Sequence, residues 1–158
     1  NRIKPVWVEL GLQTIHEESA RYIRRGYKLP VFENAVSELR KRGIDVIVHT
    51  ILCLPNETEQ DILKTIEYLN HQDIQGIKLQ LADIYLASPF YIPTPEEYYQ
   101  LLGMCISHLR PDIVIHRLTG DGPKNLLIAP LWTCNKRQVL NQFQSYLKTH
   151  DIWQGKEC

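Results

Sequence analysis

The chain has 158 residues, of which 44% are hydrophobic and 23% charged, and its 18 basic and 18 acidic side chains give a formal net charge of zero. These values are typical of one soluble domain, and no low-complexity tract suggests disorder. No apolar run is long enough to cross a membrane, and no signal-peptide pattern is present. Because the charge is balanced, neither nucleic acid nor an acidic membrane is expected as a general partner, although a local basic patch stays possible.

The cysteines are widely spaced and form no CxxC pair, so neither a zinc site nor a disulfide framework is indicated. We interpret them as reduced thiols of a cytoplasmic protein. The four are Cys53, Cys105, Cys134 and Cys158. The chain begins at Asn1, and its first strand-like run follows almost at once at Val6, so we expect a fragment of a longer protein.

Hydrophobic periodicity and turn signals predict an alternation of strands and helices. Thr58 with Asp61, and Thr94 with Glu97, resemble capping boxes and mark two helix starts. In chain order we expect a strand at Val6–Gln13, a short helical turn at Glu17–Arg24, a helix at Phe32–Arg42, a strand at Asp45–Leu54, a helix at Glu59–Asn70, a strand at Ile77–Leu81, a helix from Pro95 to about Leu109, a strand at Ile113–Leu118 and a last helix over about Lys136–Thr149.

This alternation predicts an α/β fold of parallel βα repeats. Each repeat spans roughly 30 to 40 residues, the usual length of one βα unit, and consecutive units imply a parallel sheet with right-handed crossovers. About four units would make half of an eight-unit barrel. An open doubly wound sheet fits the same pattern.

Polar side chains occur on strands that otherwise have a buried pattern. Because side chains alternate across a strand, helices should cover the apolar face and leave a polar face on the other side. Buried charges must pair or meet a ligand, so an internal network, such as Glu9 with Lys78, and a ligand cavity are both open. We favour a cavity at the carboxyl ends of the strands, where parallel α/β folds bind ligands. The polar face would carry Glu9, Gln13, His49, Lys78, Gln80 and one of His116 and Arg117.

The fourth strand and the loop after it offer two further candidates. The loop Thr119–Lys124 contains two glycines, and Asp121 could orient a substrate there, although Asp-Gly-Pro is also ordinary turn chemistry. His49 and His116 are the histidines expected on strands. A metal held by both is an alternative that lacks a nearby carboxylate and HxH spacing.

Several segments together resemble the radical S-adenosylmethionine (SAM) superfamily. Residues 8–14 (VELGLQT) resemble the fourth barrel strand of those enzymes, residues 51–58 (ILCLPNET) their GxIxGLPGET segment, and residues 76–81 (GIKLQL) their sixth strand. The runs HRLTGDGP at 116–123 and WQGK at 153–156 are similar to a YhcC-like branch of the superfamily. The resemblance covers nearly the whole chain.

The resemblance implies a fold and a reaction. Residues 1–110 would form the C-terminal half of a partial (βα)6 TIM-like barrel, and residues 111–158 a family-specific C-terminal extension. In this family a 4Fe-4S cluster, held by three cysteines of a CxxxCxxC loop, binds SAM. Reductive cleavage of SAM gives a 5′-deoxyadenosyl radical, which abstracts hydrogen from a substrate. An electron donor such as flavodoxin or ferredoxin is implied, whereas the substrate stays unknown.

The chain also departs from the family pattern. The cluster loop and the first three strands are absent, so the cluster ligands are expected on a missing N-terminal part, and the chain alone is expected to be inactive. His49, Cys53 and Asn56 stand where the pattern has glycine, and Cys53 is expected to crowd the approach of adenine. Leu81 runs directly into Ala82 where the branch has a longer connection, so a loop is either deleted or left out of the sequence.

The resemblance assigns two groups of site residues and no metal ligand. Glu9 and Gln13 would lie near the ribose of SAM, with Ile51 beside its adenine. The SAM-facing candidates are Glu9, Gln13, His49, Ile51, Gln80 and Leu81. The substrate-side candidates are His116, Arg117, Thr119 and Asp121.

Two other functions stay open. One is a metal-dependent barrel hydrolase that uses His49 and His116. The other is a non-catalytic module that binds RNA or a protein partner, in which a local basic cluster would contact phosphates. The ordinary interpretation of such a cluster is a solvated helix face. Its members are Arg21, Arg24, Arg25 and Lys28.

Overall fold

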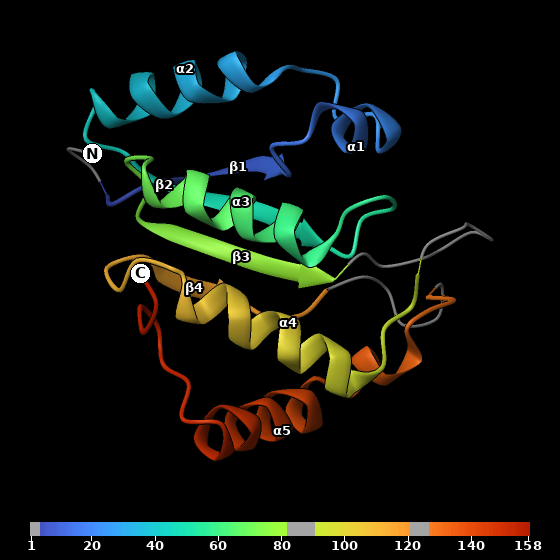
Figure 1. Ribbon diagram of the computed structural model, residues 1–158. Coiled ribbons are helices and arrows are strands. Elements are labelled where there is room, and N and C mark those ends of the chain that lie inside the picture. The colour runs from blue at the N-terminus through green and yellow to red at the C-terminus, as the bar shows by residue number, and fades with distance from the viewer. Residues whose placement is uncertain (1–3, 82–90, 121–126) are drawn as a thin grey trace.

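The structure is a computed structural model that describes residues 4–81, 91–120 and 127–158. The connection expected to be shortened at Ala82 therefore lies outside the described residues, as does Asp121. The strands are β1 (Trp7–Gln13), β2 (Asp45–Leu52), β3 (Gly76–Leu81) and β4 (Val114–Arg117). The helices are α1 (Glu17–Tyr22), α2 (Leu29–Arg40), α3 (Glu59–Asn70), α4 (Pro95–Ser107) and α5 (Lys136–Thr149), with a 3-10 turn, η1, at Leu131–Cys134 (Figure 1).

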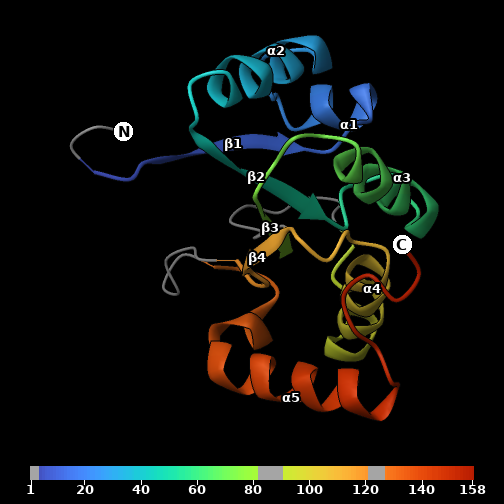
Figure 2. The same cartoon turned by 90° about the vertical axis from the view of Figure 1, so that its left-hand side faces the viewer.

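The four strands form one parallel sheet in the order β1-β2-β3-β4. Each right-handed crossover therefore advances the sheet in the same direction, which places the connecting helices on one face. Figure 2 shows α3 and α4 on one side of the sheet, with α2 above β1. A doubly wound sheet would reverse direction and place helices on both faces. The structure thus confirms the barrel-like arrangement over the doubly wound alternative.

Local signals fix where the helices begin. At α3, the Thr58 side chain accepts a hydrogen bond from the Asp61 backbone, and the Asp61 carboxylate accepts one from the Thr58 backbone. Thr94 and Glu97 make the same reciprocal pair at α4, so both predicted capping boxes are confirmed. Helix α2 begins at Leu29, earlier than the predicted Phe32. Pro30 lies in its first turn, a position that favours proline, whereas the prediction used apolar spacing alone.

A single apolar core fills the space between the helices and the sheet. The core includes buried side chains from β2 and from three helices: Val46 and Val48 of β2, Phe32 of α2, Ile66 of α3 and Leu102 of α4. These β2 side chains alternate with Ile47, His49 and Ile51 along the strand, which places the latter three on the opposite face. Within the described residues, no helix covers that opposite face, and the candidate site lies there.

The C-terminal segment packs against the rest of the fold. The aromatic ring of Phe143 on α5 lies 5.8 Å from that of Tyr99 on α4. Beyond α5, the Gln154 side chain donates hydrogen bonds to the carbonyls of Arg110 and Ile113 at 2.8 and 2.7 Å. The WQGK element therefore ties the end of the chain to the turn that enters β4. The boundary between residues 110 and 111 stays a prediction.

Candidate functional site

Three ionisable side chains from three neighbouring strands meet on the uncovered face. Oε2 of Glu9 on β1 accepts a hydrogen bond from Nε2 of His49 on β2 at 2.8 Å. The same oxygen lies 2.6 Å from Nζ of Lys78 on β3. The side chains of Glu9, His49 and Lys78 are 39%, 28% and 10% exposed. The internal network of Glu9 with Lys78 is thus present, on the face where a ligand was expected.

These contacts keep Glu9 ionised. The pKa of Glu9 is lowered from 4.5 to about 2. The hydrogen bond from Lys78 is the largest cause, the hydrogen bond from His49 contributes in the same direction, and burial opposes both. A carboxyl group with a lowered pKa stabilises the fold above its unfolded-state pKa, and this contribution is lost as the pH falls toward the folded value. For Glu9 the loss therefore occurs between pH 4.5 and about 2.

The expected adenine side of the site lies further along β2 and β3. Ile51 is in register with Gln80, and both side chains are half-buried. By alternation they share the face of His49 and Lys78. Leu81 is only 3% exposed and belongs to the apolar core, so it can offer this face its backbone rather than its side chain.

Gln13 reaches the same face through an irregular strand end. Its backbone is left-handed, with φ of 61°, and the register with β2 shifts between Gly11 and Gln13. The side-chain amide folds back over β1, where it lies 2.8 Å from the carbonyl oxygen of Gly11. A Cβ atom on Gly11 would collide with this amide, so the absence of a side chain at Gly11 makes room for it. Since Glu9 and Gly11 belong to one face of β1, the Gln13 amide lies on the same face as Glu9.

The substrate-side candidates are more dispersed. His116 is exposed, and its ring lies over Gly76. A Cβ atom added to Gly76 would come within 2.6 Å of this ring. Arg117 is half-buried and in register with β3 beyond a local irregularity. Thr119 is 5% exposed. These residues follow one another along the β4 edge, and Asp121 lies outside the described residues.

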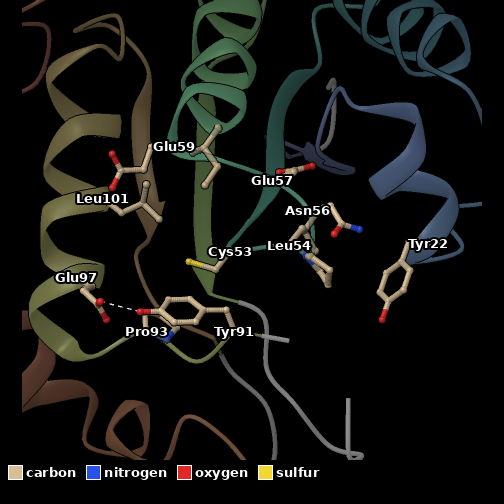
Figure 3. Close-up of a pocket in the computed structure, with 12 residues that line it drawn as sticks. Tyr22, Cys53, Leu54, Asn56, Glu57, Glu59, Tyr91, Pro93, Glu97 and Leu101 are labelled. Carbon is tan, nitrogen blue, oxygen red and sulfur yellow. Dashed lines mark hydrogen bonds between the residues drawn. The ribbon is translucent and has the colours of Figure 1, made fainter. Parts of the chain in front are cut away.

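A cavity of about 500 Å³ lies at the carboxyl end of β2 (Figure 3). Its wall includes the loop after β2 and the first turns of α3 and α4, and the Tyr91 hydroxyl donates a hydrogen bond to Glu97 at 2.7 Å. Within the described part of the chain, Oε1 of Glu57 is buried without a hydrogen-bond partner. The lining combines the apolar Leu54, Ile62 and Leu101 with the carboxylates of Glu57, Glu59 and Glu97.

Sequence reasoning missed most of this cavity. The position of Glu57 and Glu59 directly after a strand end was a usable signal, because ligands gather there in parallel α/β folds. Tyr91 and Glu97 carried no such signal, since they arrive from the approach to a later helix. Only folding brings them opposite Cys53, as Figure 3 shows.

Two residues after β2 have a backbone conformation that favours glycine. Cys53 and Asn56 have φ of 61° and 66°. Asparagine tolerates this left-handed region, whereas for most other L-residues it costs about 1–2 kcal/mol. Both positions correspond to glycines of the GxIxGLPGET pattern. The loop thus keeps the backbone shape that the pattern predicts, although the glycines themselves are absent.

The Cys53 side chain lines the cavity as a protonated thiol. Burial and, to a smaller extent, the nearby carboxylates of Glu97, Glu57 and Glu59 together raise its pKa to about 11. A thiol with so high a pKa is a poor nucleophile and a poor metal ligand at neutral pH. Cys53 therefore contributes a neutral side chain to the cavity wall, and its crowding of the adenine approach stays a prediction.

Replacing Cys53 by glycine should raise the free energy of unfolding by about 1 kcal/mol, because glycine adopts the left-handed backbone without strain. Alanine keeps the Cβ and the strain, so Cys53→Ala should give no gain. Urea unfolding of the two variants and the parent chain measures the difference. Equal stabilities of the glycine and alanine variants would contradict the assignment of strain to this position.

The basic cluster considered for phosphate contact is divided by the fold. The Arg25 side chain is only 1% exposed, and its Nη1 donates to the carbonyl oxygens of Leu12 and Thr14 at 3.2 and 2.7 Å. Its Nη2 pairs with Glu17 at 3.1 Å. The suggestion that Arg25 belongs to an exposed patch is therefore wrong, because these contacts bury it beneath the end of β1. Arg24 remains exposed.

The cysteines are all unpaired and lie on different elements, from the end of β2 to the C-terminus. Within residues 4–81, 91–120 and 127–158, no group of three His, Cys, Asp or Glu side chains is arranged to hold a metal ion. The described residues therefore offer no three-ligand group for a 4Fe-4S cluster, whereas the hydrolase alternative with His49 and His116 stays a prediction. Over the same residues, no helix has the length and apolar character needed to span a membrane.

Parallel βα units that advance in one direction, with a polar inner face and a cavity at the carboxyl strand ends, define a segment of a TIM-like barrel. Residues 2–69 match the Radical SAM superfamily, and residues 80–149 match the Radical_SAM C-terminal domain. The chain belongs to the radical SAM superfamily, as its sequence motifs predicted.

The chain is also similar to curated relatives and shares its fold with a solved structure. The chain is 35% identical over 160 residues to the uncharacterized protein YtqA of Bacillus subtilis, covering 96% of this chain and 50% of YtqA. It is 30% identical over 156 residues to protein YhcC of Escherichia coli K12, covering 93% and 50%. The chain thus spans about half the length of these relatives. Elp3 of Methanocaldococcus infernus, lacking its N-terminal residues 1–46, shares the fold with a TM-score of 0.78 at 15% identity, over 94% of this chain and 37% of that one.

Proposed function

We propose that this chain is the part of a radical SAM enzyme that receives the adenosyl portion of SAM on the uncovered face of its sheet. The observation that carries the proposal is the Glu9 carboxylate, held on that face by His49 and Lys78 through one of its two oxygens. Such an ionised acceptor suits the hydroxyl groups of a ribose. Bound SAM, together with a reduced 4Fe-4S cluster, would supply a 5′-deoxyadenosyl radical for hydrogen abstraction.

The residues around Glu9 fit a nucleoside with an attached cationic group. Gln13 adds a second hydrogen-bonding group on the face of Glu9, and Ile51 offers an apolar surface on the same face for a base. Beyond the strand ends, the carboxylates of Glu57 and Glu97 make the cavity acidic. An acidic, partly apolar site favours a cationic, partly apolar ligand such as SAM.

The cluster requires residues other than those described, because no suitable ligand group occurs among them. We propose that its three cysteines belong to another part of the complete enzyme, which receives its electron from a flavodoxin or a ferredoxin. His116, Arg117, Thr119 and Asp121 are proposed to contact the substrate or to close the site.

Replacing Glu9 by glutamine in the intact protein should weaken SAM binding about tenfold or more, because a hydrogen bond to a charged group contributes about 1.5–3 kcal/mol. Glu38→Gln, on an exposed helix residue that pairs with Lys41 and Arg42, is the matched control. Equilibrium dialysis with labelled SAM measures affinity, and chromatography after anaerobic reduction measures 5′-deoxyadenosine. Absence of SAM binding by the unaltered intact protein would refute the proposed function.

A further inference from the structure

Lys78 is a buried cation whose role the family motifs leave open. It sits in the middle of β3, is 8% exposed as a residue, and extends its ammonium group to Oε2 of Glu9. Placing a lysine inside a fold removes its charge from water, which is costly unless the charge is paired. Its pairing with Glu9 offsets that cost, and because the two residues lie on non-adjacent strands, the pair also spans β2.

The two contacts of Glu9 fall on the same oxygen. His49 and Lys78 approach Oε2 from β2 and β3, at 2.8 and 2.6 Å. Two donors from different strands restrict the rotation of the carboxylate, since turning it would break both contacts. Within the described residues, Oε1 takes part in neither contact. The arrangement therefore orients one oxygen and leaves the other to accept a hydrogen bond.

We propose that Lys78 is a positioning residue: it fixes the Glu9 carboxylate in one orientation, so that Oε1 accepts a hydrogen bond from a ribose hydroxyl of bound SAM. This inference rests on the proposed function. It assigns Lys78 no contact with SAM, and its effect on SAM passes through Glu9. A preorganised acceptor binds more tightly than a mobile one, because less conformational freedom is lost on binding.

The charges around Glu9 give the proposal a pH signature. Among the residues that the structure describes, the ionisable groups in contact with Glu9 are His49 from β2 and Lys78 from β3, and His116 extends over Gly76 from β4. Lys78 is the largest cause of the lowered pKa of Glu9. Without Lys78 that pKa should rise from about 2 toward the ordinary 4.5, so Glu9 would protonate at a higher pH. SAM binding would then weaken between pH 6 and 4.5 in the variant and stay nearly constant in the parent protein.

The test is Lys78→Met in the intact protein, which replaces the cation by an apolar chain of similar length. SAM affinity at pH 7 should fall about fivefold, which matches the typical net contribution of a single hydrogen bond, and it should fall further at pH 5. Lys64→Met, on an exposed lysine of α3 paired with Asp61, should leave both values unchanged. NMR of ¹³C-labelled glutamate carboxyl groups should show the Glu9 titration moved to higher pH in Lys78→Met alone.

A double variant separates positioning from a merely structural role. If Lys78 acts through Glu9, adding Lys78→Met to Glu9→Gln should cause no further loss of SAM affinity. It also removes both partners of the pair, which avoids the unpaired Glu9 carboxylate if Lys78→Met alone folds poorly. A full additional loss in the double variant, or unchanged affinity in a folded Lys78→Met protein, would overturn the proposal. If the parent protein binds SAM and Glu9→Gln weakens it, either result refutes the role of Lys78 and leaves the proposed function standing.

Discussion

Replacing Arg25 by methionine is expected to lower the free energy of unfolding of this chain by about 3 kcal/mol, because buried hydrogen-bonded charges leave several groups unsatisfied when removed. Besides Leu12 and Thr14, the guanidinium donates through Nε to the carbonyl oxygen of Tyr27 at 2.9 Å. Methionine fills most of the volume but donates nothing. Urea unfolding followed by circular dichroism measures the change.

Arg24→Met is the matched control, since Arg24 is the neighbouring arginine and is exposed. Its effect should stay within about 0.5 kcal/mol, as for most surface substitutions. Similar losses in both variants would show that Arg25 has no special structural role. Because Arg25 secures the carbonyls on either side of Gln13, its replacement should also loosen the strand end that we assign to SAM binding.

Replacing Phe143 by alanine should cost about 3–5 kcal/mol, the usual range for deleting a fully buried aromatic side chain. The Phe143 ring is 1% exposed, and its centroid lies 5.8 Å from that of Tyr99 and 6.4 Å from that of Tyr146. Its loss leaves a cavity where α5 packs on α4. Thermal and urea unfolding should show the lower stability, together with faster proteolysis within α5.

Leu140→Ala provides the control on the same helix, because Leu140 is 41% exposed. It should cost less than about 1 kcal/mol, since little apolar surface leaves the core. A Phe143→Ala chain as stable as Leu140→Ala would show that α5 contributes little to the fold. The sequence predicted α5 at its observed bounds but gave no indication of its partner helix.

Part of the candidate site was predictable from local patterns. Strand alternation placed Glu9, His49 and Lys78 on one face, and the resemblance to GxIxGLPGET marked the loop after β2. The left-handed backbone at Cys53 and Asn56 agrees with glycine positions in that pattern. These features depend on neighbours close in sequence, so the sequence carried enough information to indicate them.

Other parts of the site depended on distant segments. The burial of Arg25 could not be inferred from a basic run, because its partners are backbone carbonyls that any sequence supplies. The cavity could not be outlined because its walls come from α1, the loop after β2 and the start of α4. A charged run has the same sequence pattern whether it faces solvent or is buried. A capping glutamate likewise has the same pattern whether solvent or a cavity lies beside it.

The sequence by itself determined the order of strands and helices, the two capping boxes and the membership in the radical SAM superfamily, because periodicity, capping and motifs are encoded in short segments. Only the tertiary structure decided that His49 and Lys78 share one oxygen of Glu9. That contact depends on how three parallel strands pair, each separated from the next by a whole helix and its loops. Such a register is set by packing across the sheet, which no short segment of the chain specifies.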